Sequence, residues 1–139
     1  MNLDPTTMQF SLKLLAALVA GFAIGAERES RGKPAGISTN SFVIGGAMMF
    51  AFISQLADPS SPARIAAQIV SGVGFLGAGI ILKSDKGGVT NLTTAASIWF
   101  SASIGIALGF GYYLVAALAT LYAIVVPRIP HISRLNQDR

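Results

Sequence analysis

Five long apolar segments occupy most of this 139-residue chain and constrain its fold more than any other feature. A helix needs roughly 20 mainly apolar residues to cross the hydrocarbon core of a membrane, and about 17 is still enough. The chain has 53% hydrophobic and 12% charged residues, whereas soluble domains carry about 25% charged residues. We therefore expect an all-α polytopic membrane protein, a compact bundle of five transmembrane helices. The predicted spans are residues 8–26, 38–57, 65–82, 92–109 and 110–126.

Five spans leave only short connectors. We therefore expect residues 1–126 to form one transmembrane domain and residues 127–139 a short tail. The last two spans are separated by Gly109-Phe110-Gly111, a join tight enough to predict an antiparallel hairpin. An alternative with four spans, in which this region is a single broken helix, stays open at this point.

Lys and Arg are distributed unevenly between the two ends of the predicted bundle. With five spans, one end receives eight of them and the other end receives only Arg64. The positive-inside rule makes the end with eight charges cytoplasmic, which places the N-terminus outside and the C-terminus inside. We expect Lys13, which lies within the first span, to extend its ammonium outward to the surface. The eight residues are Arg28, Arg31, Lys33, Lys83, Lys86, Arg128, Arg134 and Arg139.

Small residues recur at helical spacing along three of the spans. Helices in lipid associate through such faces, because small side chains let the backbones approach closely. The third span carries Ala67, Ser71, Gly74 and Ala78 along one face. The surplus of small faces indicates a homo-oligomer. The residues expected to pack helices in the first and fourth spans are Gly21, Gly25, Ser101, Gly105 and Gly109.

A few polar residues lie where lipid would not tolerate them unpaired. Glu27 and Arg28, at the cytoplasmic end of the first span, either pair with neighbouring helices or face lipid headgroups. We expect Gln68 to face the bundle, because its amide would be unsatisfied in lipid. It either holds helices together or lines a polar path. The same choice, or simple bonding back to helix carbonyls, applies to the hydroxyl groups at the start of the fourth span, Thr93, Thr94 and Ser97.

The composition argues against several classes of function. The chain has no Cys and one His, which excludes thiol nucleophiles and thiolate or His-rich metal sites. No nucleophile stands with a base and an orienting group, so we expect no enzyme. The ten basic residues are dispersed among apolar segments, which argues against nucleic acid. Residues 72–77 match GxGxxG, but no acidic residue follows at the spacing of a dinucleotide site.

Carboxylates suited to Mg²⁺ are scarce. The only plausible ligands are Glu27, Glu29, Asp58 and Asp85, and Asp58 lies at the opposite end from the others. Because Mg²⁺ is usually held by one or two carboxylates and retained waters, we expect no high-affinity site within one protomer and no other cofactor. A weak or shared Mg²⁺ site, with Glu27 as the candidate ligand, stays open.

Three motifs resemble the MgtC/SapB family of bacterial inner-membrane proteins. The first is Gly25-Ala26-Glu27-Arg28 followed by Gly32 and Gly36, the second is the long run of residues 64–79, and the third is residues 92–99. The resemblance extends over most of the chain. The functional motif residues that it identifies are Glu27, Arg28, Gly32, Gly36, Arg64, Gln68, Ser71, Gly72, Gly74, Gly77, Gly79, Thr93, Thr94 and Ser97.

The resemblance implies a five-span membrane domain with a cytoplasmic C-terminus in the bacterial inner membrane. It also implies a role in adaptation to low magnesium and, in pathogens, in virulence, with the F-type ATP synthase as a possible membrane partner. We therefore expect a non-enzymatic membrane protein that acts through helix contacts. The alternative is a transporter or channel for Mg²⁺ or another small ion, with a polar path formed by Glu27, Arg64, Gln68, Ser71 and Thr93.

Overall fold

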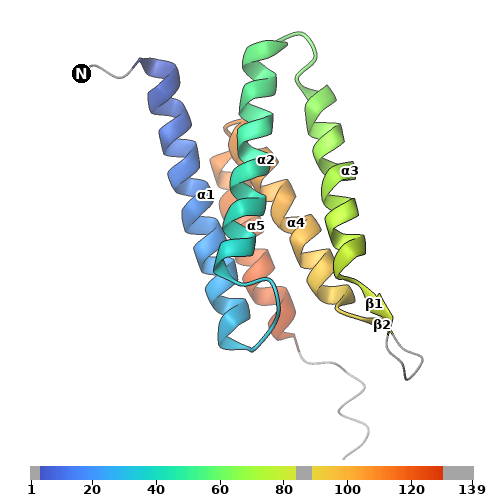
Figure 1. The fold of residues 1–139 in the computed structure, drawn as a ribbon. Coiled ribbons are helices and arrows are strands. Elements are labelled where there is room, and N and C mark those ends of the chain that lie inside the picture. Colours follow the sequence, from blue (N-terminus) through green and yellow to red (C-terminus); the bar gives the residue numbers. More distant parts are fainter. Residues whose placement is uncertain (1–3, 84–88, 130–139) are drawn as a thin grey trace, which may run out of the picture.

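The computed structural model describes residues 4–83 and 89–129 and shows a bundle of five helices (Figure 1). Lys86, Asp85, Arg134 and Arg139, which entered the sequence predictions, lie outside the described residues. Four of the helices are long and apolar enough to cross a membrane, and the fifth is apolar but shorter. The prediction of an all-α polytopic bundle is confirmed. The helices are α1 (Pro5–Ser30), α2 (Ile37–Ala57), α3 (Ala63–Ile80), α4 (Leu92–Gly109) and α5 (Tyr113–Val125).

The start of α1 is fixed by a side-chain cap. Asp4 precedes Pro5, which occupies the first turn, and the Asp4 carboxylate accepts a hydrogen bond from the backbone N–H of Thr7 at 3.2 Å. The Thr7 hydroxyl also donates to Asp4, and this bond holds the pKa of Asp4 below its usual value. At its other end α1 continues four residues beyond the predicted span, through Glu27 and Arg28 to Ser30.

The third predicted span ends two residues early, because the chain changes from helix to strand. α3 stops at Ile80, and β1 (Leu82–Lys83) then pairs with β2 (Val89–Thr90) in a short antiparallel ribbon. Apolar Leu82 fits the hydropathy of a span, so composition alone did not reveal this strand. The following helix, α4, has the bounds that the sequence predicted.

A tight turn separates α4 from α5. Gly111 has a φ of +85°, a conformation that glycine adopts without strain, and α5 begins only at Tyr113. A short 3₁₀ helix, η1 (Val126–Arg128), continues α5. The side chain of Arg128 reaches Glu27 at the end of α1, so α5 runs antiparallel to α4, as the hairpin prediction requires. The structure thus has two helices where the four-span alternative has one broken helix.

α2 packs against the glycine faces of both α1 and α4. A Cβ atom on Gly21 would lie 2.5 Å from Cα of Ser41, and one on Gly109 would lie 2.7 Å from the carbonyl oxygen of Met48. Gly25 and Gly105 approach the α2 backbone even more closely, at Ile37 and Ile44 respectively. The main apolar core lies along these contacts; among its fully buried members are Ala17, Ile44, Met48 and Ile104.

α3 packs at the periphery of the bundle (Figure 1). Only Ile69 and Gly77 of its residues are buried, whereas half of the residues of α4 are buried. The remaining faces of α3 are therefore exposed on the surface of the protomer, where a membrane would surround them.

Candidate functional site

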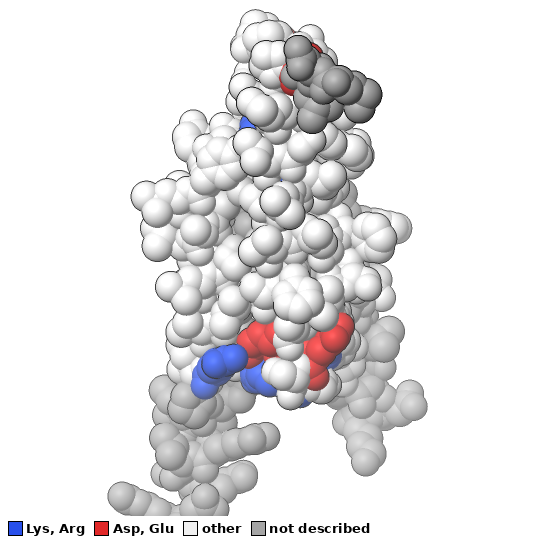
Figure 2. Space-filling view, turned by 90° about the vertical axis from the view of Figure 1, so that its left-hand side faces the viewer, with Lys and Arg blue, Asp and Glu red and all other residues white. Residues whose placement is uncertain are grey.

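The charged side chains gather at the ends of the bundle. On the face shown in Figure 2, a broad uncharged band separates a charged lower end from the upper part of the molecule. The lower end contains Glu27, Arg28, Arg31 and Arg128, which we call the arginine cluster. Arg64 lies in the first turn of α3, at the opposite end of the bundle, where it pairs with Asp58.

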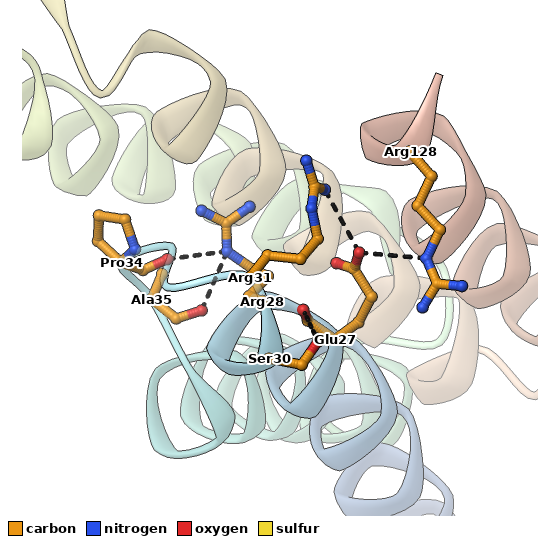
Figure 3. A network of polar contacts seen from close by, with 7 residues as sticks. All are labelled: Glu27, Arg28, Ser30, Arg31, Pro34, Ala35 and Arg128. Atoms are coloured by element: carbon orange, nitrogen blue, oxygen red, sulfur yellow. Dashed lines mark hydrogen bonds and ion pairs between the residues drawn. The ribbon is translucent and has the colours of Figure 1, made fainter. Parts of the chain in front are cut away.

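Glu27 is the buried centre of the arginine cluster, with 6% of its surface exposed. Its Oε1 atom accepts from Nη1 of Arg31 at 3.3 Å and from Nε of Arg128 at 3.4 Å (Figure 3). Losing either arginine would leave a buried carboxylate with less compensation, which is costly. Of the two interpretations open from the sequence, the structure has the paired one. The pair with Arg128 ties the end of α1 to η1, which continues α5.

Arg28 is 3% exposed and joins three parts of the chain. Its Nε donates to the carbonyl oxygens of Pro34, at 2.8 Å, and of Ala35, at 3.1 Å (Figure 3). Its Nη2 donates to Oγ1 of Thr94 at 2.9 Å. The planar guanidinium presents several donors in fixed directions. Arg28 therefore fixes the connection between α1 and α2 against the first turn of α4.

Asn40 extends this network into the bundle, and sequence reasoning missed it. The residue is fully buried, and its Nδ2 donates to the carbonyl oxygens of Ala35, at 2.7 Å, and Gly36, at 3.0 Å. Its Oδ1 accepts from the hydroxyl of Ser101 on α4 at 2.8 Å. The carbonyl oxygen of Ala35 thus accepts hydrogen bonds from both Arg28 and Asn40. The signal that could have identified Asn40 was an amide within a predicted membrane span, at its polar start.

The connection between α1 and α2 requires two of the motif glycines. Gly32 has a φ of +61°. The carboxylate of Glu29 occupies the place where a side chain on Gly36 would begin, and it accepts from the backbone N–H of Ile37 at 2.9 Å. Glu29 thereby satisfies one of the N–H groups that lack a partner at the start of α2.

The three hydroxyl residues at the start of α4 have different surroundings. Thr94 is buried and accepts from Arg28. Ser97 donates back to the carbonyl oxygen of Thr94 at 2.8 Å, the local bonding that was one of the three expectations. Thr93 is exposed. Only Thr94 joins the buried network.

The prediction that Gln68 faces the interior of the bundle is wrong. Gln68 is exposed, because α3 contacts the bundle along its edge only and the face with Gln68 borders an open groove between α2 and α3. Of the remaining α3 motif residues, Gly77 is buried against Ala95. The others are exposed, and a Cβ on any of these glycines would meet no atom within 4 Å: Gly72, Gly74 and Gly79, with Ser71 exposed beside them.

The prediction that Lys13 extends outward to the surface is also wrong. Lys13 is 6% exposed, and its Nζ donates to the backbone carbonyl of Gly109 at 2.6 Å. The ammonium also lies 4.8 Å from the centre of the Phe52 ring. The last carbonyls of a helix lack intrahelical partners and carry partial negative charge. The end of α4 therefore attracts this cation inward.

The described residues contain no group of three or more His, Asp or Glu residues placed to hold a metal ion. Glu27, the candidate ligand for Mg²⁺, has two guanidinium groups at Oε1. Their positive charge opposes a divalent cation at the same atom.

Comparisons with known proteins agree on one family. The sequence profile described as the MgtC family matches residues 14–132. Protein MgtC of Salmonella typhimurium (strain 14028s / SGSC 2262) is 49% identical over 112 residues, and Protein MgtC of Brucella abortus (strain 2308) is 47% identical over 114 residues. Each alignment covers 81% of this chain and 48% of the relative, so the chain spans about half the length of these proteins. No solved structure gives a significant match.

Proposed function

Because the chain belongs to the MgtC family, we propose that it is a non-enzymatic membrane protein that acts by docking its third helix against another membrane helix. The observation that carries this proposal is the exposed small-residue face of α3. Ala67, Ser71, Gly74 and Ala78 are all exposed on the protomer.

The corresponding faces of α1 and α4 are already occupied. Gly21 and Gly25 lie against the first turns of α2, and Gly105 and Gly109 lie against its later turns. The face of α3 is the remaining small-residue face from the sequence pattern, and it would allow a second helix to approach closely in lipid. The buried network around Arg28 supports this function, because it fixes the helices against which α3 packs.

We further propose that the protein acts in adaptation to low magnesium, and in pathogens in virulence, at the bacterial inner membrane. The family resemblance supports this physiology. The positive-inside rule supports an N-terminus outside and a cytoplasmic C-terminus, since Arg28, Arg31 and Arg128 share one end of the bundle. The docking partner is a second copy of the chain or a larger membrane complex such as the F-type ATP synthase.

Cysteine crosslinking in native membranes tests the docking face. The chain has no cysteine, so single variants give unambiguous products. We expect Ser71→Cys and Ala78→Cys to form crosslinked species, at twice the mass for a second copy or with a subunit of the partner complex. Val19→Cys is the matched control, because Val19 is 61% exposed on α1 outside the small-residue faces. Equal crosslinking from α3 and from the control would contradict the proposal.

A growth assay tests the physiology separately. Ser71→Leu and Ala78→Leu should fail to restore growth at limiting Mg²⁺ in a bacterium that lacks its own MgtC, whereas Val19→Leu should restore it. If all three variants restored growth equally, the face would have no role in this adaptation.

The alternative, an ion path, has less support from the geometry. Glu27 is buried among arginines at one end of the bundle, and Arg64 is exposed at the other. Gln68 borders a groove whose other lining residues are apolar. Vesicles that contain the purified protein decide between the two functions. Ion flux that is lost in both Glu27→Gln and Gln68→Ala would support transport and count against docking as the main activity.

A further inference from the structure

We propose that the groove between α2 and α3 binds one zwitterionic phospholipid, with an acyl chain in the groove and the headgroup at Arg64 and Asp58. The groove and the charged pair adjoin each other, because the groove and the polar cavity beside it share Ile65 and Gln68. The proposal requires only that the helices lie in a membrane, and it does not depend on docking through α3.

The groove has the chemistry of an acyl-chain site. Its volume is about 420 Å³, within the range of roughly 300–1,000 Å³ typical of small-molecule sites. Gln68 is its only polar lining side chain. An open apolar groove in a membrane is filled by lipid or by another helix. Representative lining residues are Phe42, Gly46 and Phe50 from α2 and Ile65, Gly72 and Leu76 from α3.

The length of the groove matches one leaflet. Ile65 and Leu76 mark its two ends on α3, and the rise of a helix places them about 16 Å apart along the axis. Half of a hydrocarbon core of about 30 Å is roughly 15 Å. A chain that enters beside Ile65 would therefore reach about the middle of the membrane.

The charges at the mouth select the headgroup. Nη1 of Arg64 lies 3.8 Å from Oδ2 of Asp58, and their side chains are 79% and 40% exposed, so this pair is weak and open to a ligand. A guanidinium binds phosphate oxygens with paired hydrogen bonds. The Asp58 carboxylate, which Ser60 orients through a 2.6 Å hydrogen bond, would accept from an ammonium group. Adjacent opposite charges are thus complementary to phosphoethanolamine, whereas a headgroup without an amine would leave Asp58 facing a phosphate.

Native mass spectrometry of the full chain in detergent tests this assignment with added phosphatidylethanolamine or phosphatidylglycerol. We expect one retained phosphatidylethanolamine per protomer, and about tenfold weaker binding for Arg64→Gln, since a hydrogen bond to a charged group is lost. Asp58→Asn should remove the preference for phosphatidylethanolamine over phosphatidylglycerol. A Ser103→Ala variant, altered at an exposed hydroxyl that bonds within α4, should bind like the unaltered protein.

Gly72 allows the groove itself to be filled without disturbing the fold, and Gly45 provides a matched control. A Cβ on Gly72 or on Gly45 would meet no atom within 4 Å, but only Gly72 lines this groove, while Gly45 borders a different groove between α1 and α2. Gly72→Leu should therefore abolish lipid retention, whereas the Gly45→Leu variant should still retain the lipid.

Three results would overturn the proposal. One is undiminished lipid retention in Gly72→Leu, and another is equal binding of both lipids that does not change in Arg64→Gln or Asp58→Asn. The third is a protein that retains no lipid and crosslinks to a second copy from Gly72→Cys, since a helix would then fill the groove. Failure of the docking proposal is distinguishable from failure of this one. The docking proposal is tested by crosslinking at Ser71 and Ala78, and its failure would leave lipid retention unchanged.

Discussion

The ammonium nitrogen of Lys13 lies 2.6 Å from the backbone carbonyl oxygen of Gly109, and this contact joins the first helix to the end of the fourth. The carbonyl is among the last four of α4, which have no intrahelical donor. The ring of Phe52 on α2 lies 4.8 Å from the same ammonium. Three helices therefore meet at one buried cation.

Lys13→Met should destabilise the protein by about 1–2 kcal/mol, because it removes a hydrogen bond from a charged donor while relieving part of the cost of burying that charge. Phe52→Leu should weaken the protein partly by removing the cation–π contact, worth about 0.5–2 kcal/mol. A double-mutant cycle of the free energy of unfolding in mixed micelles checks the coupling. Strictly additive effects would contradict an interaction between Lys13 and Phe52.

Asn40→Leu should cost roughly 1–3 kcal/mol of unfolding free energy, the cost of one buried polar group left without a partner, because the Ser101 hydroxyl loses its acceptor while the Ala35 and Gly36 carbonyls each keep another donor. The change removes only the side-chain amide bonds to these two carbonyls. Ser101→Ala should cost less, because only one bond is lost. The control Ser103→Ala should change stability by no more than about 0.5 kcal/mol. A stability loss in Asn40→Leu no larger than in this control would refute the role of the network.

The sequence predicted those features that depend on hydropathy and residue size. The bounds of α4 matched because its apolar run ends at the glycines of a turn. The small residues at Gly21 and Gly105 lie where helices approach closely, because their spacing places them on one face of each helix. Pattern reasoning identifies such a face, but it cannot say which helix will cover it.

The errors concern polar side chains whose partners are distant in the sequence. Lys13 was expected at the surface, but its acceptor, 96 residues away, is a helix-end carbonyl that no side-chain pattern displays. Gln68 was expected inside, but α3 packs along its edge and leaves that face open. Arg28 was located correctly at the end of α1, while its partners at Pro34 and Ala35 depend on the conformation of the connection.

Gly105→Ala should destabilise the bundle by about 1–3 kcal/mol, the cost of overpacking a closely packed contact. The added methyl group would meet the Ile44 carbonyl and the Ala47 side chain, so α2 and α4 would have to separate. Gly45→Ala is the matched control, because its Cβ meets nothing within 4 Å and alanine favours helix by about 1 kcal/mol. Unfolding in mixed micelles should therefore show opposite signs for the two changes. The same sign for both would contradict the packing described for α2 and α4.

Arg28→Lys should loosen the connection between α1 and α2, because one ammonium cannot reproduce the donors that reach Pro34, Ala35 and Thr94. A loss of about 1.4 kcal/mol of local stability would increase the open population roughly tenfold. Trypsin should then cleave after Arg31 about tenfold faster in purified protein, with the site identified by mass spectrometry; Lys33 is followed by Pro34, and trypsin does not cleave that bond. Arg31→Lys, which keeps the trypsin site at an exposed position, should change the rate little; equal acceleration in both variants would argue against Arg28 as the fixing residue.

Cysteine labelling should place Arg64 on the opposite side of the membrane from Lys33 and Arg128. The structure has Arg64 at one end of the bundle and Arg128 at the other, beside Glu27, so the helices alternate in direction through α5. In intact cells a membrane-impermeant maleimide should label Arg64→Cys. It should label Lys33→Cys and Arg128→Cys only after permeabilisation, because the positive-inside rule places their end in the cytoplasm.

Labelling of Arg128→Cys together with Arg64→Cys would show that α5 does not cross the bilayer. Labelling of Lys33→Cys in intact cells would instead reverse the orientation and move the proposed headgroup site at Arg64 and Asp58 to the inner leaflet.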